Sequence, residues 1–205
     1  MSSDRLLILF LRNFLAGSVK TRLIPRWGKE GALEIYKRLV QRTHQLLYAF
    51  PGVKHVFYDR YVPHQDLFSS SEFDQYVQSG HDLGERMDHA FSHGFSRGMH
   101  KIVIVGSDCY DLEKEHLELA FSSLDRVPYV LGPARDGGYY LLGMTKPSSF
   151  LFQHTRWSHA RVLEEALEKL KQRHENYKLL PSLMDIDTPE DVERLSKRGI
   201  TLMGG

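Results

Sequence analysis

The sequence predicts an α/β fold in which a mainly parallel central sheet is covered by helices on both faces. Short apolar runs of strand length alternate along the chain with longer segments of helical periodicity, which is the rhythm of strand, helix and strand units. The runs at 6–11 and 102–105 are continuously apolar, as expected of strands buried on both faces. No repeat or low-complexity linker interrupts the 205 residues, so we expect residues 1–205 to form a single domain.

Composition excludes several classes of protein. With 41% hydrophobic and 26% charged residues, the chain has the make-up of a soluble globular protein. A net charge of +1 gives no case for a nucleic-acid partner, so any polyphosphate must be bound by local groups. The single Cys109 can form no intramolecular disulfide, which favours a cytoplasmic location. The apolar run at 6–11, bracketed by Arg5 and Arg12, is too short for a signal peptide or a membrane span.

The first third of the chain is expected to open with a strand and a long helix. We predict a strand at 6–11, a loop at 12–25, a helix at 29–50, a strand at 53–58, an irregular segment at 61–73 and a short strand at 76–77. The helix is indicated by side chains that recur every three or four positions on one face, namely Leu33, Tyr36, Leu39, Val40, Thr43, Leu46, Leu47 and Phe50. Pro51-Gly52 ends it.

Asp82, with Glu85 three residues later, has the pattern of a helix N-cap. The alternative is that this helix amino terminus, which follows a glycine-containing turn at 79–82, meets a ligand. The following helix is expected to bury Leu83, Met87, Ala90, Phe91 and Phe95. His89 and His93, four residues apart, could share a face and bind a metal, but two ligands are too few, so we expect them to be solvated.

The rest of the chain continues the alternation. A strand ending at Val105, a helix at 114–123, strands at 129–132 and 139–142, and a helix from Ser158 to about Gln172 are predicted in that order. The last of these helices is expected to turn Val162, Leu163, Ala166, Leu167 and Leu170 inward. Thr188-Pro189-Glu190-Asp191 indicates the start of a final helix, with threonine as N-cap and proline at the first helical position.

Two stretches place an aspartate beside backbone that a ligand can approach. The apolar strand at 102–105 breaks at Gly106 and delivers Asp108 just beyond its carboxyl end, and Asp136 lies in a glycine-rich turn at 132–138. Ligands of open α/β sheets bind outside the carboxyl ends of the strands, although both stretches could also be ordinary turns. Cys109, next to Asp108, is a candidate nucleophile or a small residue that packs under the turn.

Lys20 and Arg22 are candidate phosphate ligands in the loop after the first strand. Two cations spaced by one residue in a non-helical loop project the same way, although a solvated loop would also contain them. Asp108 and Asp187 are candidate ligands of Mg²⁺ or Mn²⁺, hard cations that bind one or two carboxylates and complete their shells with phosphate and water. Alternatively, Asp187 only complements the dipole of the helix that follows.

Six segments in a fixed order also resemble a known family. They are Lys20-Thr21-Arg22-Leu23, Asp82-Leu83-Gly84-Glu85-Arg86-Met87, Gly106-Ser107-Asp108-Cys109, Gly132-Pro133-Ala134 with Asp136-Gly137-Gly138-Tyr139-Tyr140, Trp157-Ser158 and Asp185-Ile186-Asp187-Thr188-Pro189-Glu190-Asp191. The set resembles the bacterial glycosyltransferase family associated with radical-SAM and selenodomain proteins. That family lies in the nucleotide-diphospho-sugar transferase superfamily of GT-A fold. The first segment also resembles 2-phospho-L-lactate guanylyltransferase, and the general plan resembles molybdenum cofactor guanylyltransferase.

The resemblance implies that Asp108 holds a divalent metal that bridges the diphosphate of a nucleotide. The chain departs from the Asp-x-Asp signature of glycosyltransferases, because Asp111 comes one position too late. Nucleotidyltransferases of the fold use one aspartate here and a second near the carboxyl end, which matches Asp108 with Asp187. The loop at 13–18 lacks their Gly-x-Gly-x-Arg-Met pattern, and Arg135 and His159 replace residues common in relatives.

Together these inferences predict a metal-dependent transferase that uses a nucleotide sugar as donor and an unidentified small molecule as acceptor. The predicted catalytic residues are Asp108, Asp136 and Lys20, and the predicted nucleotide and substrate ligands are Arg12, Lys20, Arg22, Gly106, Ser107, Gly137 and Gly138. Two alternatives stay open. One is a nucleotidyltransferase that releases pyrophosphate from a nucleoside triphosphate, and the other is an inactive nucleotide-binding module.

Overall fold

The computed structural model, which describes residues 4–155, 157 and 159–202, contains a seven-stranded sheet in the order β3-β2-β1-β4-β6-β5-β7. The strands are β1 (Arg5–Leu11), β2 (Val53–Tyr58), β3 (Asp74–Val77), β4 (Lys101–Val105), β5 (Tyr129–Pro133), β6 (Tyr139–Met144) and β7 (Tyr177–Leu179). β6 runs antiparallel to β4 and β5, whereas the other neighbouring strands pair in parallel. The predicted α/β class with a mainly parallel sheet is confirmed.

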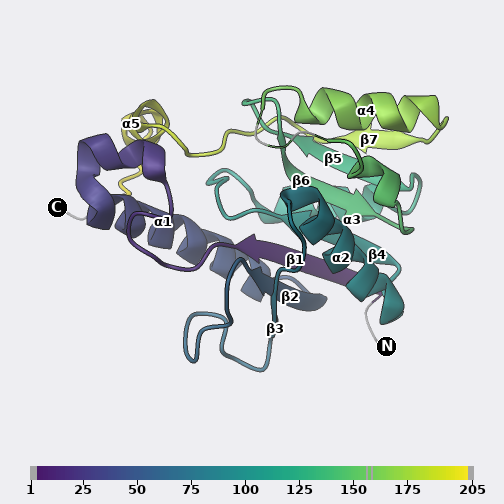
Figure 1. Cartoon of the computed structure of the whole chain (residues 1–205), viewed down its shortest axis with the longest axis horizontal. Helices are drawn as coiled ribbons and strands as arrows, with labels where there is room; N and C mark the ends of the chain where they lie inside the picture. The colour runs from purple at the N-terminus through teal and green to yellow at the C-terminus, as the bar shows by residue number, and fades with distance from the viewer. Residues whose placement is uncertain (1–3, 156, 158, 203–205) are drawn as a thin grey trace.

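The helices cover the two faces of this sheet (Figure 1). They are α1 (Ile24–Tyr48), α2 (Leu83–Ser96), α3 (Lys114–Ser123), α4 (Val162–Gln172) and α5 (Pro189–Lys197), with short 3-10 turns η1 (Thr21–Leu23) and η2 (Ser149–Leu151). Alternate residues of β1 explain the arrangement, since Leu7 and Leu9 pack with α1 and α3 while Leu6 and Ile8 pack with α2 and α4. None of the helices in the described ranges is both long and apolar enough to cross a bilayer.

The strand order reverses direction between β1 and β4. After β1 the chain builds outward through β2 and β3, then returns by α2 to place β4 on the other side of β1. At such a switch point the loops leaving the two strands diverge and leave a crevice at their carboxyl ends. The loop after β1 and the turn after β4 therefore face the same region, and these segments carry Lys20 and Asp108.

A separate apolar cluster attaches the C-terminal segment to the start of α1. Its members come from η1, α1, the segment after β7 and α5, and are Leu23, Ala32, Ile35, Leu39, Met184, Ile186, Val192, Leu195 and Leu202. Figure 1 shows α5 beside the first turns of α1 at one end of the molecule. Because Thr188 caps α5 and its hydroxyl pairs with Asp191, the residue before the cap, Asp187, has a fixed position.

Several predictions about elements need correction. Helix α1 begins at Ile24 rather than at residue 29, and a kink at Gly28 (φ 69°) separates its first turn from the amphipathic part that the periodicity detects. The prediction that Leu83 is buried is wrong, since it is 43% exposed and the buried face of α2 is formed by Gly84, Met87, Ala90, Phe91 and Gly94. The fourth helix starts at Val162 with Arg161 at the N-cap, and the predicted cap, Ser158, lies outside the described residues.

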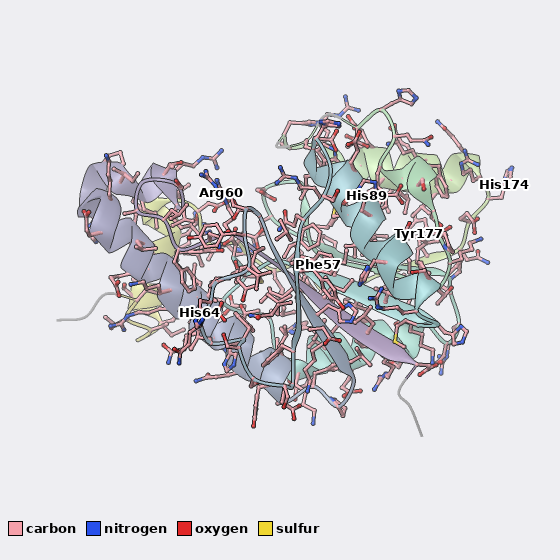
Figure 2. The ribbon with its side chains drawn as sticks, turned by 60° about the horizontal axis from the view of Figure 1, so that its bottom comes forward. Phe57, Arg60, His64, His89, His174 and Tyr177 are labelled. Atoms are coloured by element: carbon pink, nitrogen blue, oxygen red, sulfur yellow. The ribbon has the colours of Figure 1, made fainter. Side chains whose placement is uncertain are left out.

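The two histidines of α2 have different surroundings. His89 is exposed on α2, as predicted (Figure 2). The prediction that His93 is solvated is wrong, because its ring packs at 4.4 Å from the ring of Tyr76 and also contacts His55 and Phe57. Side chains four apart on a helix share a face only roughly, so His93 reaches the sheet while His89 does not.

Candidate functional site

The side chain of Lys20 lies buried between two aspartates at the carboxyl ends of β1 and β4. Its Nζ is 2.8 Å from Asp108 Oδ1 and 2.8 Å from Asp187 Oδ1, and only 3% of the side chain is exposed. Burial lowers the pKa of the Lys20 ammonium, but Asp108 and Asp187 outweigh it, so the pKa is raised above its ordinary value. The structure therefore brings together three residues that were assigned separately from the sequence.

The backbone of Lys20 is left-handed, with φ 46° and ψ 44°. A non-glycine residue in this region carries strain that the surrounding structure must offset, and such strain is concentrated at functional sites. The conformation ends the loop after β1 and starts the 3-10 turn η1, where Leu23 anchors the chain in the apolar cluster with α5. Lys20 therefore points inward while Arg22, on the turn itself, stays exposed.

The two aspartates differ in how they meet the ammonium. Asp187 Oδ1 accepts a hydrogen bond from Lys20 Nζ, whereas Asp108 Oδ1 forms an ion pair without hydrogen-bond geometry. Over the described residues, that buried Asp108 oxygen accepts no hydrogen bond. The side chains of Asp108 and Asp187 are 43% and 37% exposed, so both carboxylates are buried at the ammonium and open on the other side.

Asp185 belongs to the same acidic group, although sequence reasoning gave it no role. Burial raises its pKa to about 7, helped by the negative charges of Asp108, Asp136 and Asp187 and opposed by Lys20. A backbone bridge between Cys109 and Asp185 sets it beside the turn after β4. In the sequence, the spacing of Asp185 and Asp187 could have indicated this position, because residues two apart in extended backbone project to the same side.

The glycine-rich turn between β5 and β6 holds Asp136 at the surface. Asp136 Oδ1 accepts a hydrogen bond from the backbone amide of Gly138 at 2.9 Å, which fixes the turn. Gly137 has φ 91°, and a Cβ there would overlap the backbone oxygen of Ala160 just before α4. The positive φ and the close approach of Ala160 explain the glycine at position 137, and Asp136 contributes to the electrostatic environment of Asp185.

The loop after β1 is attached to the loop after β2 and to the turn after β4. Asn13 is 4% exposed, and its amide group bonds the backbone of Arg60 and Tyr61. Arg60 lies on the loop beyond β2 (Figure 2). Arg12, 57% exposed, forms a long ion pair of 3.7 Å with Asp59. This loop is therefore ordered by polar contacts, and the guanidinium of Arg12 stays largely in solvent.

Tyr36, on α1, joins the loop after β1 to the turn after β4. Its hydroxyl accepts hydrogen bonds from the Arg12 amide at 2.9 Å and from Ser107 Oγ at 3.2 Å. The Ser107 side chain is thus directed into the protein, and the residue is 5% exposed. Gly106, by contrast, is exposed, and a Cβ there would meet nothing within 4 Å.

Cys109 is buried beneath this turn and carries no feature of an activated nucleophile. Burial raises the pKa of its thiol, and the nearby charges of Asp185 and Asp111 raise it further. Asp111, which follows the turn, is held by a two-pronged ion pair to Arg198 at 2.7 and 2.8 Å. Neither residue joins the group around Lys20.

The start of α2 is an ordinary cap, and it contacts another of the sequence segments. Asp82 accepts a hydrogen bond from the amide of Glu85 at 2.9 Å, as the capping interpretation predicts. A Cβ at Gly84 would lie 2.5 Å from the indole of Trp157, so the glycine makes room for that ring. The segments at 82–87 and 157 therefore adjoin each other in the folded chain.

The sequence of residues 42–159 matches the model of a family described as uncharacterized protein conserved in bacteria, DUF2064. The chain belongs to the DUF2064 family. Asp108 and the turn with Asp136 fall inside the matched range, whereas Lys20 and Asp187 lie on either side of it. Among curated proteins we find no match.

This DUF2064 chain is also similar to solved structures. A proposed nucleotide-diphospho-sugar transferase from Desulfovibrio desulfuricans G20 has 31% identity and a TM-score of 0.90, over 97% of this chain and 88% of that chain. CMP:2-keto-3-deoxy-manno-octonic acid synthetase complexed with CTP has 10% identity and a TM-score of 0.58, over 96% and 98%. Rv0371c from Mycobacterium tuberculosis H37Rv complexed with manganese has 12% identity and a TM-score of 0.56, over 96% and 100%. The last two likenesses concern the fold alone, and the fold is that of nucleotide-diphospho-sugar transferases and nucleotidyltransferases.

Proposed function

We propose that this protein is a metal-dependent transferase that uses a nucleotide sugar as its donor. The observation that carries the proposal is the convergence of Asp108 and Asp187 on the buried ammonium of Lys20, at the switch point between β1 and β4. A buried cation held by two half-open carboxylates suits a diphosphate with its counterion better than it suits packing. The description of the relative with 31% identity supports a nucleotide-sugar donor.

The carboxylates fit a divalent metal. The side chains of Asp108 and Asp187 are 43% and 37% exposed although each has one oxygen at the Lys20 ammonium, and two carboxylates leave room for phosphate and water in the shell of Mg²⁺ or Mn²⁺. Within the described ranges no three His, Cys, Asp or Glu side chains form a closed metal cluster. When bound, the metal would act as a Lewis acid that neutralises the departing diphosphate. A structural neighbour of the same fold has been solved with manganese.

The chain's own residues have separate roles in this proposal. Asp108 and Asp187 would hold the metal, Lys20 and the exposed Arg22 would bind phosphate oxygens, and Arg12 would lie beside the nucleoside. The backbone at Gly106, followed by Ser107, would give the nucleotide close access, because none of the described residues has an atom within 4 Å of a Cβ placed at Gly106. Asp136, fixed by the turn at Gly137 and Gly138, would position the sugar or the acceptor hydroxyl.

In this reaction the bond between the sugar carbon and the diphosphate oxygen breaks. A new bond forms between that carbon and the acceptor oxygen, which loses its proton, and a nucleoside diphosphate leaves. The protein contributes position and charge, because Lys20 and Arg22 offset negative charge that grows on the leaving group.

Nucleotidyl transfer is the second candidate. The observation in its favour is that Asp111, the only acid near the Asp-x-Asp position, is paired with Arg198 and does not join Asp108. A single aspartate after β4 with a second near the carboxyl end is the arrangement expected of nucleotidyltransferases. In that reaction a phosphorylated acceptor attacks the α-phosphate of a nucleoside triphosphate, and pyrophosphate leaves.

Thermal unfolding against nucleotide sugars and nucleoside triphosphates, each with and without Mn²⁺, tests the proposal. A ligand at about a hundred times its Kd adds roughly 2.7 kcal/mol, which raises the Tm by several degrees. Asp108→Asn should abolish the metal-dependent shift. Asp125→Asn, a matched control that removes an exposed acid near the start of β4, should keep it.

The ligand that gives the shift separates the candidates. A metal-dependent shift with one nucleotide sugar, followed by transfer to an acceptor, supports glycosyl transfer. A shift with one triphosphate and release of pyrophosphate supports nucleotidyl transfer instead. Tight binding without turnover of any pair supports an inactive nucleotide-binding module, and an unchanged shift in Asp108→Asn removes that residue from the metal.

A further inference from the structure

Three arginines line a pocket beside the segment at 182–184. The pocket has a volume of about 240 Å³ and is lined by Asp111, Arg135, Ser182, Leu183, Met184, Arg194 and Arg198. Asp111 is the one acid in this lining, so positive charge is in excess. The lining comes from the turn after β4, the turn between β5 and β6, the segment at 182–184, and α5 with its C-cap Arg198.

The pocket adjoins the candidate active site through the chain itself. Arg135 precedes Asp136, and Met184 precedes Asp185, so two of the lining residues are bonded to members of the acidic group. The backbone amide of Arg135 donates to the Leu183 carbonyl at 3.0 Å, and a bridge pairs Ala134 with Leu183. These contacts join the turn between β5 and β6 to the segment at 182–184, so the pocket has a fixed position beside Asp136 and Asp185.

The arginines are not equivalent. Arg198 is committed to Asp111 by two short bonds, and Arg194 has one contact of 3.4 Å with Asp191. Arg135 is exposed, and no carboxylate in residues 4–155, 157 or 159–202 lies within ion-pair distance of its guanidinium. A planar guanidinium without a partner, at the mouth of a pocket with two more cations, is suited to bind a phosphate or a carboxylate through two parallel hydrogen bonds.

We propose that this pocket binds the phosphate or carboxylate group of a small anionic acceptor and so selects the acceptor of the reaction. The identification of the ligand as acceptor rests on the proposed function, but the preference for an oxyanion rests on the pocket alone. Arg135 makes the main contact, and Arg194 and the Arg198–Asp111 pair form the wall. The other end of the acceptor then extends along the segment at 182–184 towards Asp136 and Asp185.

Binding of three compounds with one carbon skeleton tests this: glycerol, glycerol 3-phosphate and glycerate, with inorganic phosphate as the minimal probe. Calorimetry or chemical shifts of the arginine Nε–H groups would give each Kd. We expect the anions to bind and glycerol not to bind, and the tighter of the two anions distinguishes a phosphate site from a carboxylate site. Arg135→Gln should weaken anion binding about tenfold, and Arg135→Lys should restore it in part.

Two further variants make the result specific. Arg126→Gln removes an exposed arginine at the opposite end of β5 and should leave anion binding unchanged. Arg22→Gln reports on the candidate diphosphate site. If Arg22→Gln weakens phosphate binding while Arg135→Gln does not, the anion lies at the diphosphate site and the proposal is overturned.

Nucleotide binding with Mn²⁺, measured on the same wild-type sample, separates this proposal from the proposed function. If the wild type binds the anions but shows no Tm shift with any nucleotide and Mn²⁺, the transferase proposal is contradicted and the anion pocket stays in place. Equal binding of glycerol and its charged relatives would reject the anion pocket, whatever the nucleotide result.

Discussion

Lys20 shows how one residue combines strain, burial and charge. Its left-handed backbone and buried ammonium are each unfavourable alone, and the two ion pairs at 2.8 Å offset them. Because both carboxylates are partly exposed, solvent reduces the net gain below that of a fully buried pair. The position therefore depends on the charge of the side chain more than on its packing.

We expect Lys20→Met to lower the free energy of unfolding by about 1 to 3 kcal/mol, because it leaves three acids without their cation. Addition of Mn²⁺ should recover more of this loss in the variant than it adds to the wild type, since the metal replaces the missing charge. Urea unfolding with and without Mn²⁺ measures both effects. Lys37→Met, at an exposed pair on α1, is the control, and an equal loss there would contradict the argument.

At the same scale, the sequence predicted three residues that the fold brings together, but it did not predict the orientation of every candidate side chain. Asp108, Lys20 and Asp187 were predicted from their positions after strands and before a helix, and the structure brings them together. Ser107 shows the limit, because its hydroxyl bonds Tyr36 from a helix 71 residues away in sequence. Such a contact depends on tertiary packing and has no local signal.

Among the elements, the turn between β5 and β6 has the most demanding geometry. Its aspartate is exposed, whereas Gly137 is required by the fold, since it has a positive φ and lies against the segment before α4. The amide of Leu163 also donates to the Gly137 carbonyl at 2.9 Å, which joins the turn to α4 directly. A change of backbone at Gly137 would therefore move both Asp136 and the helix.

Gly137→Ala should be strongly destabilising, by about 2 to 4 kcal/mol, because a positive φ is combined with overlap of the Ala160 backbone. Gly98→Ala is a matched control with φ 79° and no atom within 4 Å of the new Cβ. It should cost about 1 kcal/mol, the strain of a positive φ alone. Chemical denaturation measures the difference, and equal losses would show that the contact with Ala160 relaxes freely.

Elements with strong periodicity were predicted within a few residues, and weak ones were not. Helix α3 was predicted at its observed bounds because its caps and apolar face agree. Strand β7 was missed, since three residues with two exposed side chains give no pattern, and it is defined only by pairing with β5. The first turn of α1 was missed for a related reason, because the kink at Gly28 interrupts the period.

For the molecule as a whole, the candidate site depends on contact between the segment after β1 and the segment before α5, at the switch point between β1 and β4. Lys20 follows β1 and Asp187 precedes α5, and they meet because the apolar cluster of Leu23 and Ile35 with Val192 fastens α5 to α1. Sequence predicted the alternation that makes the sheet, but not the strand order, since pairing of β4 with β1 and reversal of β6 are long-range choices. The position of the candidate site, at the carboxyl ends of β1 and β4, follows from this strand order.

The far edge of the sheet makes the stability of the whole molecule depend on pH. His55 on β2 is 2% exposed and packs against Tyr76 and His93, with Phe57 (Figure 2) nearby on the same strand. Burial, opposed by Asp74 and assisted by His93 and Arg97, lowers its pKa from 6.5 to about 4. In the folded state this histidine is therefore neutral at neutral pH.

Since the unfolded chain binds a proton near pH 6.5 and the folded chain only near pH 4, protonation favours unfolding between these values. The contribution of His55 to stability should be complete above about pH 7 and should fall by about 1 to 3 kcal/mol on going to about pH 4.5. Asp185, whose pKa is raised to about 7, contributes with the opposite sign over the same range and is shared by all the variants compared, so the effect of His55 is read from the difference between variants. Urea titrations at the two pH values measure the loss. His55→Phe should make the loss smaller, because a ring of similar shape stays in the cluster without a titrating group, whereas His64→Gln, on an exposed loop, should keep it. A loss of equal size in His55→Phe and the wild type would show that other groups, and not His55, set the acid sensitivity of the fold.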